Sequence, residues 1–342
     1  MPRQGWRKPE SGVRLSDHMA IGVLTHTFPP ATVDAVIAAT GRREQRNRLL
    51  PARVMVYYVL AMALFHADAY EEVMRHLVEG LTWMTGWKTH WEVPTKAAIF
   101  KSRARLGVEP LRALFRSVVQ PLGRPESRGV WYRTWRVMRI AGTTLDVAAT
   151  PENEQFFGRP ATRCGGEPSA CPQLRLTALA ESGTHAIINA ALGPYGQGET
   201  KQARELLASL RPEMLCLADR NFFSHALWRD AQQSGAALLW RVNKDLDLPV
   251  VQELPDGSHL SRLDVSSYDR DHDRNDAAVR VLEYTWDDPG RPQAEDVYRL
   301  ITTILDPGAA PAAELAALYR QRRTCSYQKP MAICSRTPPS GP

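Results

Sequence analysis

The sequence predicts a chain in two parts: an all-helical N-terminal half and an α/β half with a mixed sheet flanked by helices. From Leu15 to about residue 125 the apolar residues recur with helical spacing. Residues 120–130 are rich in proline and glycine, as linkers often are. From residue 130 to 322 strand-like apolar runs alternate with helical segments, the pattern of an α/β core. Residues 1–14 are polar and basic and are predicted to form a mobile tail.

Prolines mark the predicted helix starts in the N-terminal half. Pro30 suits the first turn of a helix because its fixed φ angle is already helical, and Val33 and Ile37 then share one apolar face. Pro51 opens a longer apolar helix, and residues 69–78 continue as another. We therefore expect a small helical domain.

A basic helix is predicted between Thr95, a good N-cap, and Gly107, a good helix end. Its apolar stripe is flanked by four basic residues: Lys96, Lys101, Arg103 and Arg105. A basic helix set among others can be the recognition helix of a helix-turn-helix unit, which would contact DNA. An ordinary amphipathic surface helix fits the periodicity equally well.

The α/β half is predicted to run in the order strand, strand, strand, helix, strand, helix, strand. The expected bounds are 137–147, 174–180, 185–192, 198–210, 214–218, 223–233 and 236–242. A polar, β-rich segment at about 244–296 reads as an insertion. A strand from 298 and a helix over 312–322 then complete the core.

Two of these strands end in a single acidic residue, Asp146 and Asp219. Burying an ionised carboxylate costs several kcal/mol unless a cation or a polar partner accompanies it. Two such carboxylates at the ends of core strands favour a shared site for a divalent metal. For either one alone, a helix cap or a turn is the simpler interpretation.

Composition narrows the class of protein. With 342 residues, 44% hydrophobic and 23% charged, the chain is typical of a globular protein, and its net charge of +6 favours a polyanionic partner such as nucleic acid. Its five cysteines form no CxxC pair, so neither a disulfide framework nor a zinc ribbon is predicted, and a reducing cytoplasm fits best. The longest apolar run, residues 54–65, falls well short of the roughly 20 residues that span a bilayer, so no membrane partner is expected.

With these motifs in place, the layout resembles that of DDE transposases of the insertion-element-four family, which have a ribonuclease-H-like core. The resemblance extends from about residue 15 to 322. It rests on segments Gly142–Asn153, Ala218–Phe222, Tyr298–Thr303 and Leu318–Arg322 in the second half, and on Phe28–Pro30, Arg48–Pro51 and Pro94–Thr95 in the first.

The resemblance implies cut-and-paste movement of DNA by three carboxylates that hold two Mg²⁺ ions, roughly 4 Å apart in such sites. Asp146 and Asp219 match the first two carboxylates, and Tyr319 and Arg322 match the start of the family's Y-x2-R-x3-E-x6-K signature. Both residues of the signature are expected to contact DNA, the arginine by forking onto a phosphate. The implied partners are double-stranded DNA with terminal inverted repeats and a second copy of the chain in a synaptic complex. The implied location is the bacterial cytoplasm, at the nucleoid.

The chain departs from the signature after Arg322. Ser326 stands where the glutamate should be and Ile333 where the lysine should be, and residues 323–342 have neither helical nor strand periodicity. Glu314, on the same predicted helix, lies about 18 Å away from that position and is a poor substitute. We therefore expect a frameshift or truncation near codon 323, loss of the third metal ligand, an unstructured tail, and little or no strand transfer.

Two other functions stay open at this point. The chain could be a catalytically inert DNA-binding protein that occupies transposon ends or inhibits the intact transposase. It could also be an unrelated ribonuclease-H-like nuclease, in which case Glu199 or Glu205 would have to supply the third acid.

Overall fold

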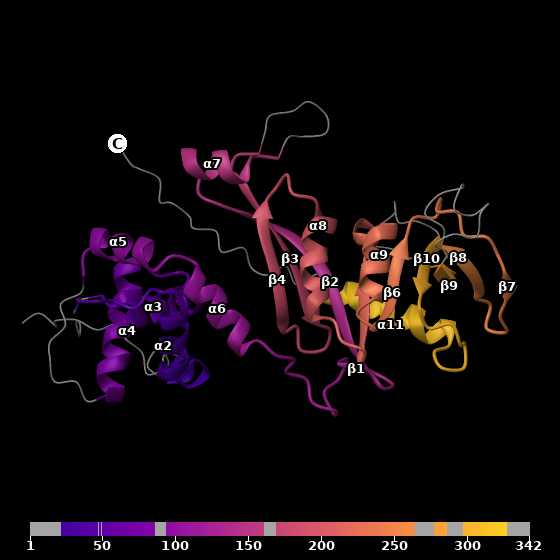
Figure 1. Cartoon of the computed structure of the whole chain (residues 1–342), viewed down its shortest axis with the longest axis horizontal. Helices are drawn as coiled ribbons and strands as arrows, with labels where there is room; N and C mark the ends of the chain where they lie inside the picture. The colour runs from indigo at the N-terminus through magenta and orange to yellow at the C-terminus, as the bar shows by residue number, and fades with distance from the viewer. Residues whose placement is uncertain are drawn as a thin grey trace, which may run out of the picture. The chain divides into compact units, whose positions relative to one another are not determined.

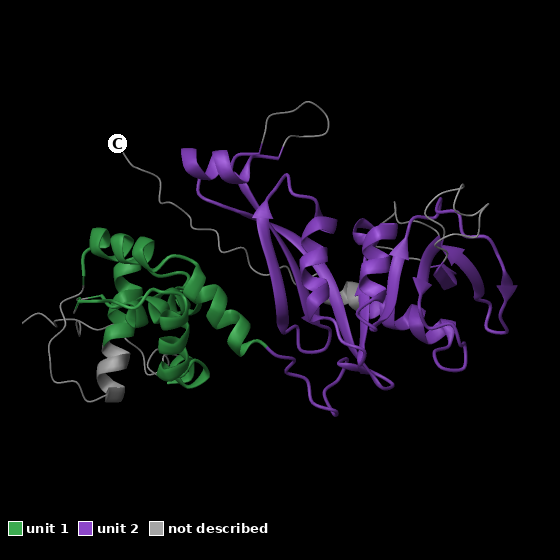
Figure 2. Ribbon diagram, viewed as in Figure 1, with its two compact units in different colours: residues 1–119 green, residues 120–342 purple. Residues whose placement is uncertain are grey.

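A computed structural model of the chain describes residues 22–46, 48, 50–85, 94–160, 169–263, 277–285 and 297–326. The side chains of residues 79–85 and 322–326 are not among the described parts. The chain divides into two compact units, residues 1–119 and 120–342 (Figure 2). The predicted N-terminal tail and all but the first few residues of the predicted C-terminal tail lie outside the described residues.

The first unit is helical in its described part, which confirms the predicted class of the N-terminal half. Its helices are α2 (Pro30–Ala39), α3 (Ala52–Leu64), α4 (Tyr70–Thr85), α5 (Lys96–Leu106) and α6 (Glu109–Val118). The predicted bounds of α5 follow from its caps. The Thr95 hydroxyl accepts a hydrogen bond from the Ala98 amide at 3.3 Å, and Gly107 ends the helix with a φ of +68° that glycine adopts without strain.

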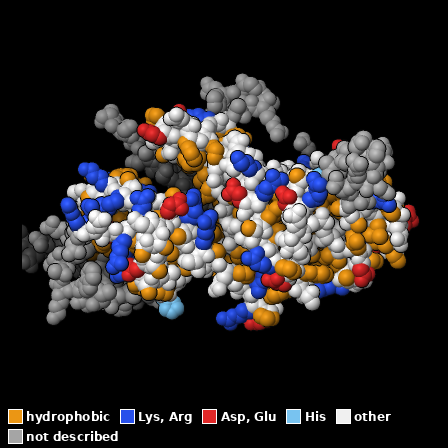
Figure 3. Space-filling model, viewed as in Figure 1, with side chains coloured by type: hydrophobic (Ala, Val, Ile, Leu, Met, Phe, Trp, Pro, Cys, Tyr) orange, Lys and Arg blue, Asp and Glu red, His pale blue; other side chains and the backbone are white. Residues whose placement is uncertain are grey.

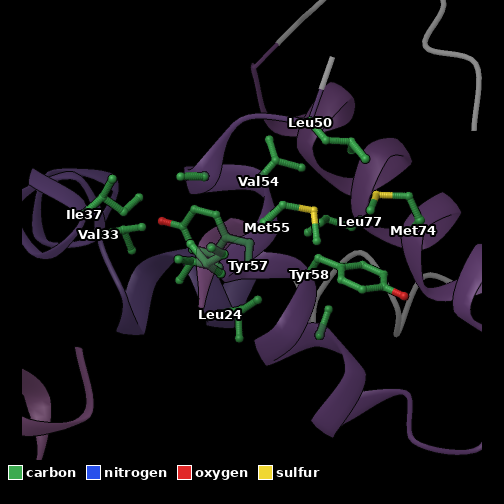
Figure 4. Close-up of a cluster of buried hydrophobic side chains, with 14 of the residues drawn as sticks. Leu24, Val33, Ile37, Leu50, Val54, Met55, Tyr57, Tyr58, Met74 and Leu77 are labelled. Carbon is green, nitrogen blue, oxygen red and sulfur yellow. The ribbon is translucent and has the colours of Figure 1, made fainter. Parts of the chain in front are cut away.

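Helix α3 lies at the centre of this unit and supplies much of its core (Figure 4). Met55 and Tyr58 are fully buried, and Val33 and Ile37 of α2 belong to the same core. The Tyr57 hydroxyl donates to the Phe28 carbonyl at 2.6 Å, so a buried polar group is satisfied within the core. Among the described residues, no helix combines the length and the apolar character that a membrane span requires.

The second unit is built on one mixed sheet, ten-stranded in its described part (Figure 1). Its strands are β1 (Trp131–Tyr132), β2 (Trp135–Asp146), β3 (Gln173–Glu181), β4 (Ile187–Pro194), β5 (Met214–Ala218), β6 (Ala237–Val242), β7 (Gln252–Glu253), β8 (His259–Leu263), β9 (Ala277–Thr285) and β10 (Val297–Thr302). The order is β4-β3-β2-β5-β6-β10-β9-β8-β7, with β1 beside β2. Strands β2, β5 and β6 are parallel, and the other pairings are antiparallel.

Helices cover both faces of this sheet (Figure 1). Helices α8 (Glu199–Leu206) and α9 (His225–Gln232) lie on one face, where the ring of Trp228 contacts that of Trp240 at 5.2 Å. Helix α11 (Ala312–Ser326) lies on the other. The arrangement agrees with the predicted ribonuclease-H-like core. The strands β7, β8 and β9 of the predicted β-rich stretch extend the main sheet beyond β10.

The face that each β2 and β5 side chain occupies follows from strand alternation. Val137 of β2 and Leu215 and Leu217 of β5 pack in one cluster with Leu315 and Tyr319 of α11, so odd-numbered positions face α11. Even-numbered β2 positions face α8. At Gly142 an added Cβ would lie 3.1 Å from the Glu199 carboxylate at the start of that helix.

The segment that leads into the sheet is fastened by a buried ion pair. Glu181 is fully buried and pairs with Arg136. It also accepts a hydrogen bond from the Gly123 amide at 2.8 Å, and Arg136 donates to the Gly123 carbonyl at 3.1 Å. The proline- and glycine-rich stretch around Gly123 is therefore tied to β2 and β3.

Helix α11 is fixed at two points. Tyr319 is 1% exposed, and its hydroxyl donates to the Ala218 carbonyl at the end of β5, at 3.1 Å. At the other end, the Asp256 carboxylate accepts from the Ala312 amide at 2.8 Å and pairs with Arg280, which is fully buried. Arg280 also donates to the Ala310 carbonyl at 2.7 Å. These contacts hold the helix against the sheet.

Replacement of Asp256 by asparagine is predicted to destabilise the second unit by about 3–5 kcal/mol, because the fully buried Arg280 loses its counter-charge. Chemical denaturation at pH 7 measures the change. Glu253→Gln, at an exposed carboxylate on β7, is the control and should change the stability little. Equal stabilities of the two variants would contradict this prediction.

The same pair predicts a dependence of stability on pH. Burial alone would raise the pKa of Asp256. Hydrogen bonds from Ser258 and the Ala312 amide, with the charge of Arg280, instead lower that pKa below its ordinary value. The stabilisation is therefore present above the pKa of the unfolded carboxyl, about 3.9, and is lost as the pH falls through the lower folded value. In the Asp256→Asn variant, this part of the acid-dependent loss of stability should be absent.

Replacement of Tyr319 by phenylalanine is predicted to cost about 1–2 kcal/mol, because the buried Ala218 carbonyl loses its donor. Tyr132→Phe is the matched control. The Tyr132 hydroxyl donates to Glu314 at 2.8 Å in an exposed position, where water can replace it. Denaturation midpoints compare the two, and a Tyr132→Phe loss as large as that of Tyr319→Phe would contradict the assigned role of Tyr319.

Candidate active site

Asp219 stands at the carboxyl end of β5, the edge of parallel strands where open α/β sheets place their sites. Its backbone is still extended, and it begins a short 3-10 turn over Arg220–Phe222. One carboxylate oxygen accepts a hydrogen bond from the Arg220 amide at 2.8 Å. The side chain is 37% exposed, so solvent and a ligand can both reach it.

The register of the sheet identifies the neighbours of Asp219. On one side, Arg139 of β2 pairs with Leu217 of β5, and the same register two residues on places Ala141 beside Asp219. Both positions are odd-numbered and face α11. On the other side, Ala218 pairs with Trp240 of β6, which places Arg241 next to Asp219.

Arg241 supplies a positive charge to this carboxylate. Its guanidinium nitrogen lies 3.7 Å from Asp219 Oδ1, and its side chain is only 7% exposed. The guanidinium also lies over the ring of Tyr298, 4.4 Å from the ring centre, which fixes its position. Sequence reasoning overlooked Arg241, although a charged residue inside the apolar run Leu238–Val242 was a signal for it.

Asp146 lies elsewhere. It is five residues beyond Ala141 on β2, about 16 Å along the strand, and the odd separation turns its side chain to the α8 face. Its carboxylate accepts a hydrogen bond from the side chain of Gln173 on β3 at 2.9 Å. The register therefore separates Asp146 from Asp219 along β2, because β2 runs well past the end of β5 and pairs there with β3 alone. Their convergence on one metal stays a prediction.

The other acids considered do not complete a site at Asp219. Glu199 faces Gly142 from the α8 side and pairs with Arg175 at 3.6 Å, and Glu205 is exposed on α8. Glu314 pairs with Arg133 at 3.2 Å near the start of α11. Within the described residues, no cluster of three or more histidine, cysteine or acidic residues could hold a metal ion.

The donor set around Asp219 does not fit Mg²⁺. This ion needs several oxygen ligands, whereas the extended register places an alanine on one side of Asp219 and the Arg241 guanidinium lies on the other. The helix that should bring the third acid continues through Ser326, whose side chain lies outside the described parts.

Two α11 residues, Tyr319 and Arg322, are predicted to contact DNA. Tyr319 is buried in the core and donates to the Ala218 carbonyl, so it positions the end of β5, and its expected DNA contact stays a prediction. The side chain of Arg322 lies outside the described parts, so its expected phosphate contact stays a prediction.

The basic residues of α5 also separate into two groups. Arg105 donates to the Leu50 carbonyl at 2.8 Å, and Arg103 lies over the rings of Tyr70 and Phe100, so both have structural contacts. Lys96 and Lys101 are exposed, with Lys96 3.4 Å from Glu71. Figure 3 shows lysine and arginine side chains spread over the visible face with acidic ones among them. DNA contact by α5 stays a prediction and falls mainly to its two lysines.

Comparison with known proteins agrees with these motifs. A family model described as the insertion element 4 transposase N-terminal domain matches residues 18–116, and one described as the transposase DDE domain matches residues 141–325. The chain is 25% identical over 298 residues to transposase InsG for insertion sequence element IS4 of Escherichia coli K12, with 86% of this chain and 64% of InsG covered. It is 24% identical over 213 residues to the putative transposase InsZ of the same strain, with 62% of this chain and 68% of InsZ covered.

Among solved structures, the chain is similar to one in a pre-cleavage Mos1 transpososome. The alignment covers 54% of this chain and 76% of the Mos1 chain, at 13% sequence identity. Its TM-score of 0.22 is too low to support a structural argument. The present chain spans slightly less than two thirds of the length of InsG. The two family models together cover both units of the chain, and the DDE model alone covers more than half of it. The chain therefore belongs to the DDE transposases of the insertion element 4 family.

Proposed function

We propose that this chain is an insertion-element transposase that binds DNA at the ends of its element and has lost metal-dependent cleavage and strand transfer. The proposal rests on one observation, the identity of the residues that surround Asp219. The acid stands at the expected edge of a ribonuclease-H-like sheet, but its strand neighbours are Ala141 and Arg241. The signature glutamate is also replaced, by Ser326.

Loss of cleavage follows from the chemistry of such sites. In an intact member, two bound Mg²⁺ ions activate the attacking water or 3′-hydroxyl and stabilise the leaving oxygen of the phosphodiester. One carboxylate beside a buried arginine offers too few oxygen ligands, and the positive charge of Arg241 repels a second cation. Asp219 and Arg241 can pair with each other, but they cannot coordinate two Mg²⁺ ions.

DNA binding is supported by different residues. The net charge of +6 favours a polyanion, and the helical unit that matches the family's N-terminal domain exposes Lys96 and Lys101. The DNA bound is double-stranded and carries the terminal inverted repeats of the element. Two copies of the chain hold the two ends in a synaptic complex.

A second function follows from the same geometry. A chain that binds element ends without cleaving them occupies the sites that an intact transposase needs, and it can enter mixed complexes with intact copies. The buried Arg241 beside Asp219 favours this inhibitory role over residual catalysis, because its positive charge opposes a bound metal ion.

The cleavage assay uses the full chain and labelled duplexes that tile the DNA on both sides of its gene, where the ends of an insertion element lie. We expect no nicking with Mg²⁺ or Mn²⁺ under conditions in which the same duplexes are shifted in a gel. Metal-dependent nicking that disappears in the Asp219→Asn variant would contradict the proposed loss of activity. Nicking that persists in that variant would indicate a contaminating nuclease.

Binding by α5 predicts that Lys101→Ala weakens the shift of end-containing duplexes and lowers the slope of log affinity against log salt by about 0.9, the value for one phosphate contact. Arg116→Ala removes the same charge from an exposed position on α6 of the same unit and is the control. If the two variants lower the slope equally, the effect is one of overall charge and the assignment to α5 fails.

A further inference from the structure

We propose that residue 141 is the position at which this chain has lost its first metal-ligating carboxylate, and that Arg241 supplies the counter-charge to the Asp219 that remains. The inference deepens the proposed function, since it rests on the β5 edge being the site of a former metal-dependent transposase. Position 141 then takes the place of Asp146 as the first ligand, and Arg241 neutralises Asp219.

The strand register carries the first part of the argument. Neighbouring strands lie about 4.8 Å apart, and side chains at paired positions stand on the same face. Extended by two residues from Arg139 and Leu217, the register places Ala141 beside Asp219, and strand alternation from Val137 and Leu217 turns both to the α11 face. A carboxylate at position 141 would therefore have oxygens within reach of an ion that Asp219 also binds.

The adjoining positions do not offer this geometry. Gly142 faces α8, where an added Cβ would already be 3.1 Å from Glu199. Thr143 returns to the α11 face, but it lies about 7 Å further along β2. Ala141 is exposed, so a larger side chain at this position displaces no core atoms.

Arg241 explains how a lone Asp219 is tolerated. Its guanidinium is 3.7 Å from the carboxylate, almost fully buried, and held over the ring of Tyr298. A buried charge is screened little by solvent, so it neutralises Asp219 and opposes a dication at the same carboxylate. The present site is therefore an arginine–carboxylate pair and not an incomplete metal site that fills at high metal concentration.

The test measures binding of Mn²⁺ to the full chain from the decrease of the free-ion signal in electron paramagnetic resonance. We expect the native chain to bind Mn²⁺ only weakly, with no change in the Asp219→Asn variant. Ala141→Asp should gain one site per chain, with at least about tenfold tighter binding because two carboxylates now share the ion. In the double variant Ala141→Asp/Asp219→Asn this gain should disappear.

Thr144→Asp is the matched control, because it adds the same charge at an exposed β2 position on the opposite face. Binding by Thr144→Asp as tight as that by Ala141→Asp would overturn the proposal. So would a stoichiometric site in the native chain that Asp219→Asn removes. Thermal unfolding checks that each variant is folded. If Ala141→Asp does not fold, Mn²⁺ binding is measured on Ala141→Glu instead, with the same expected gain.

This measurement contains no DNA, so its outcome is separate from that of the proposed function. If Mn²⁺ binding fails to appear while end-containing duplexes are still shifted, the assignment of position 141 fails and the proposed DNA binding stands. If Mn²⁺ binding appears but no duplex is shifted, the proposed function fails and the assignment of position 141 stands.

Discussion

The register between β2 and β5 is the constraint on which the candidate site depends. A strand offers alternate side chains to opposite faces, so a pairing fixes both the neighbour of each residue and the face on which they meet. Arg139 pairs with Leu217, and the same register extended by two residues places Ala141 beside Asp219. A different carboxylate, Asp146, sits at the far end of the same strand with Gln173 as its partner. The chemistry of this edge is therefore decided by backbone pairing.

Helix α11 couples the rest of the unit to the same edge. Its Tyr319 is bound to the carbonyl immediately before Asp219, and its first turn is held by the buried pair of Asp256 and Arg280. These contacts connect α11 to the end of β5, to β9 and to the loop after β7. The ribonuclease-H-like scaffold is thus held together by contacts that do not involve Ala141 or the pairing of Arg241 with Asp219.

Much of the fold could be predicted from the sequence because its signals are local. The apolar run 214–218 coincides with β5, and Thr95 and Gly107 cap α5 as expected. The segment after Asp146 shows the limit. The sequence predicts a strand over 137–147 and then a strand from 174, with no helix between them, whereas Thr150 caps a further helix, α7 (Pro151–Phe157). The site was harder to predict, because nothing local reveals how far β2 extends past β5 or that Arg241 would lie beside Asp219.

Oxidative cross-linking of paired cysteine variants tests the central claim, the neighbour of Asp219, most directly. Cysteines on adjacent strands at paired positions lie within the Cα separation of about 4.4–6.8 Å that a disulfide needs, whereas positions about 16 Å apart on opposite faces do not. In the full chain, Ala141→Cys/Asp219→Cys should yield the 141–219 disulfide-linked peptide by mass spectrometry, and Asp146→Cys/Asp219→Cys should yield no 146–219 peptide. Efficient linkage of 146 to 219, without linkage of 141 to 219, would contradict the account.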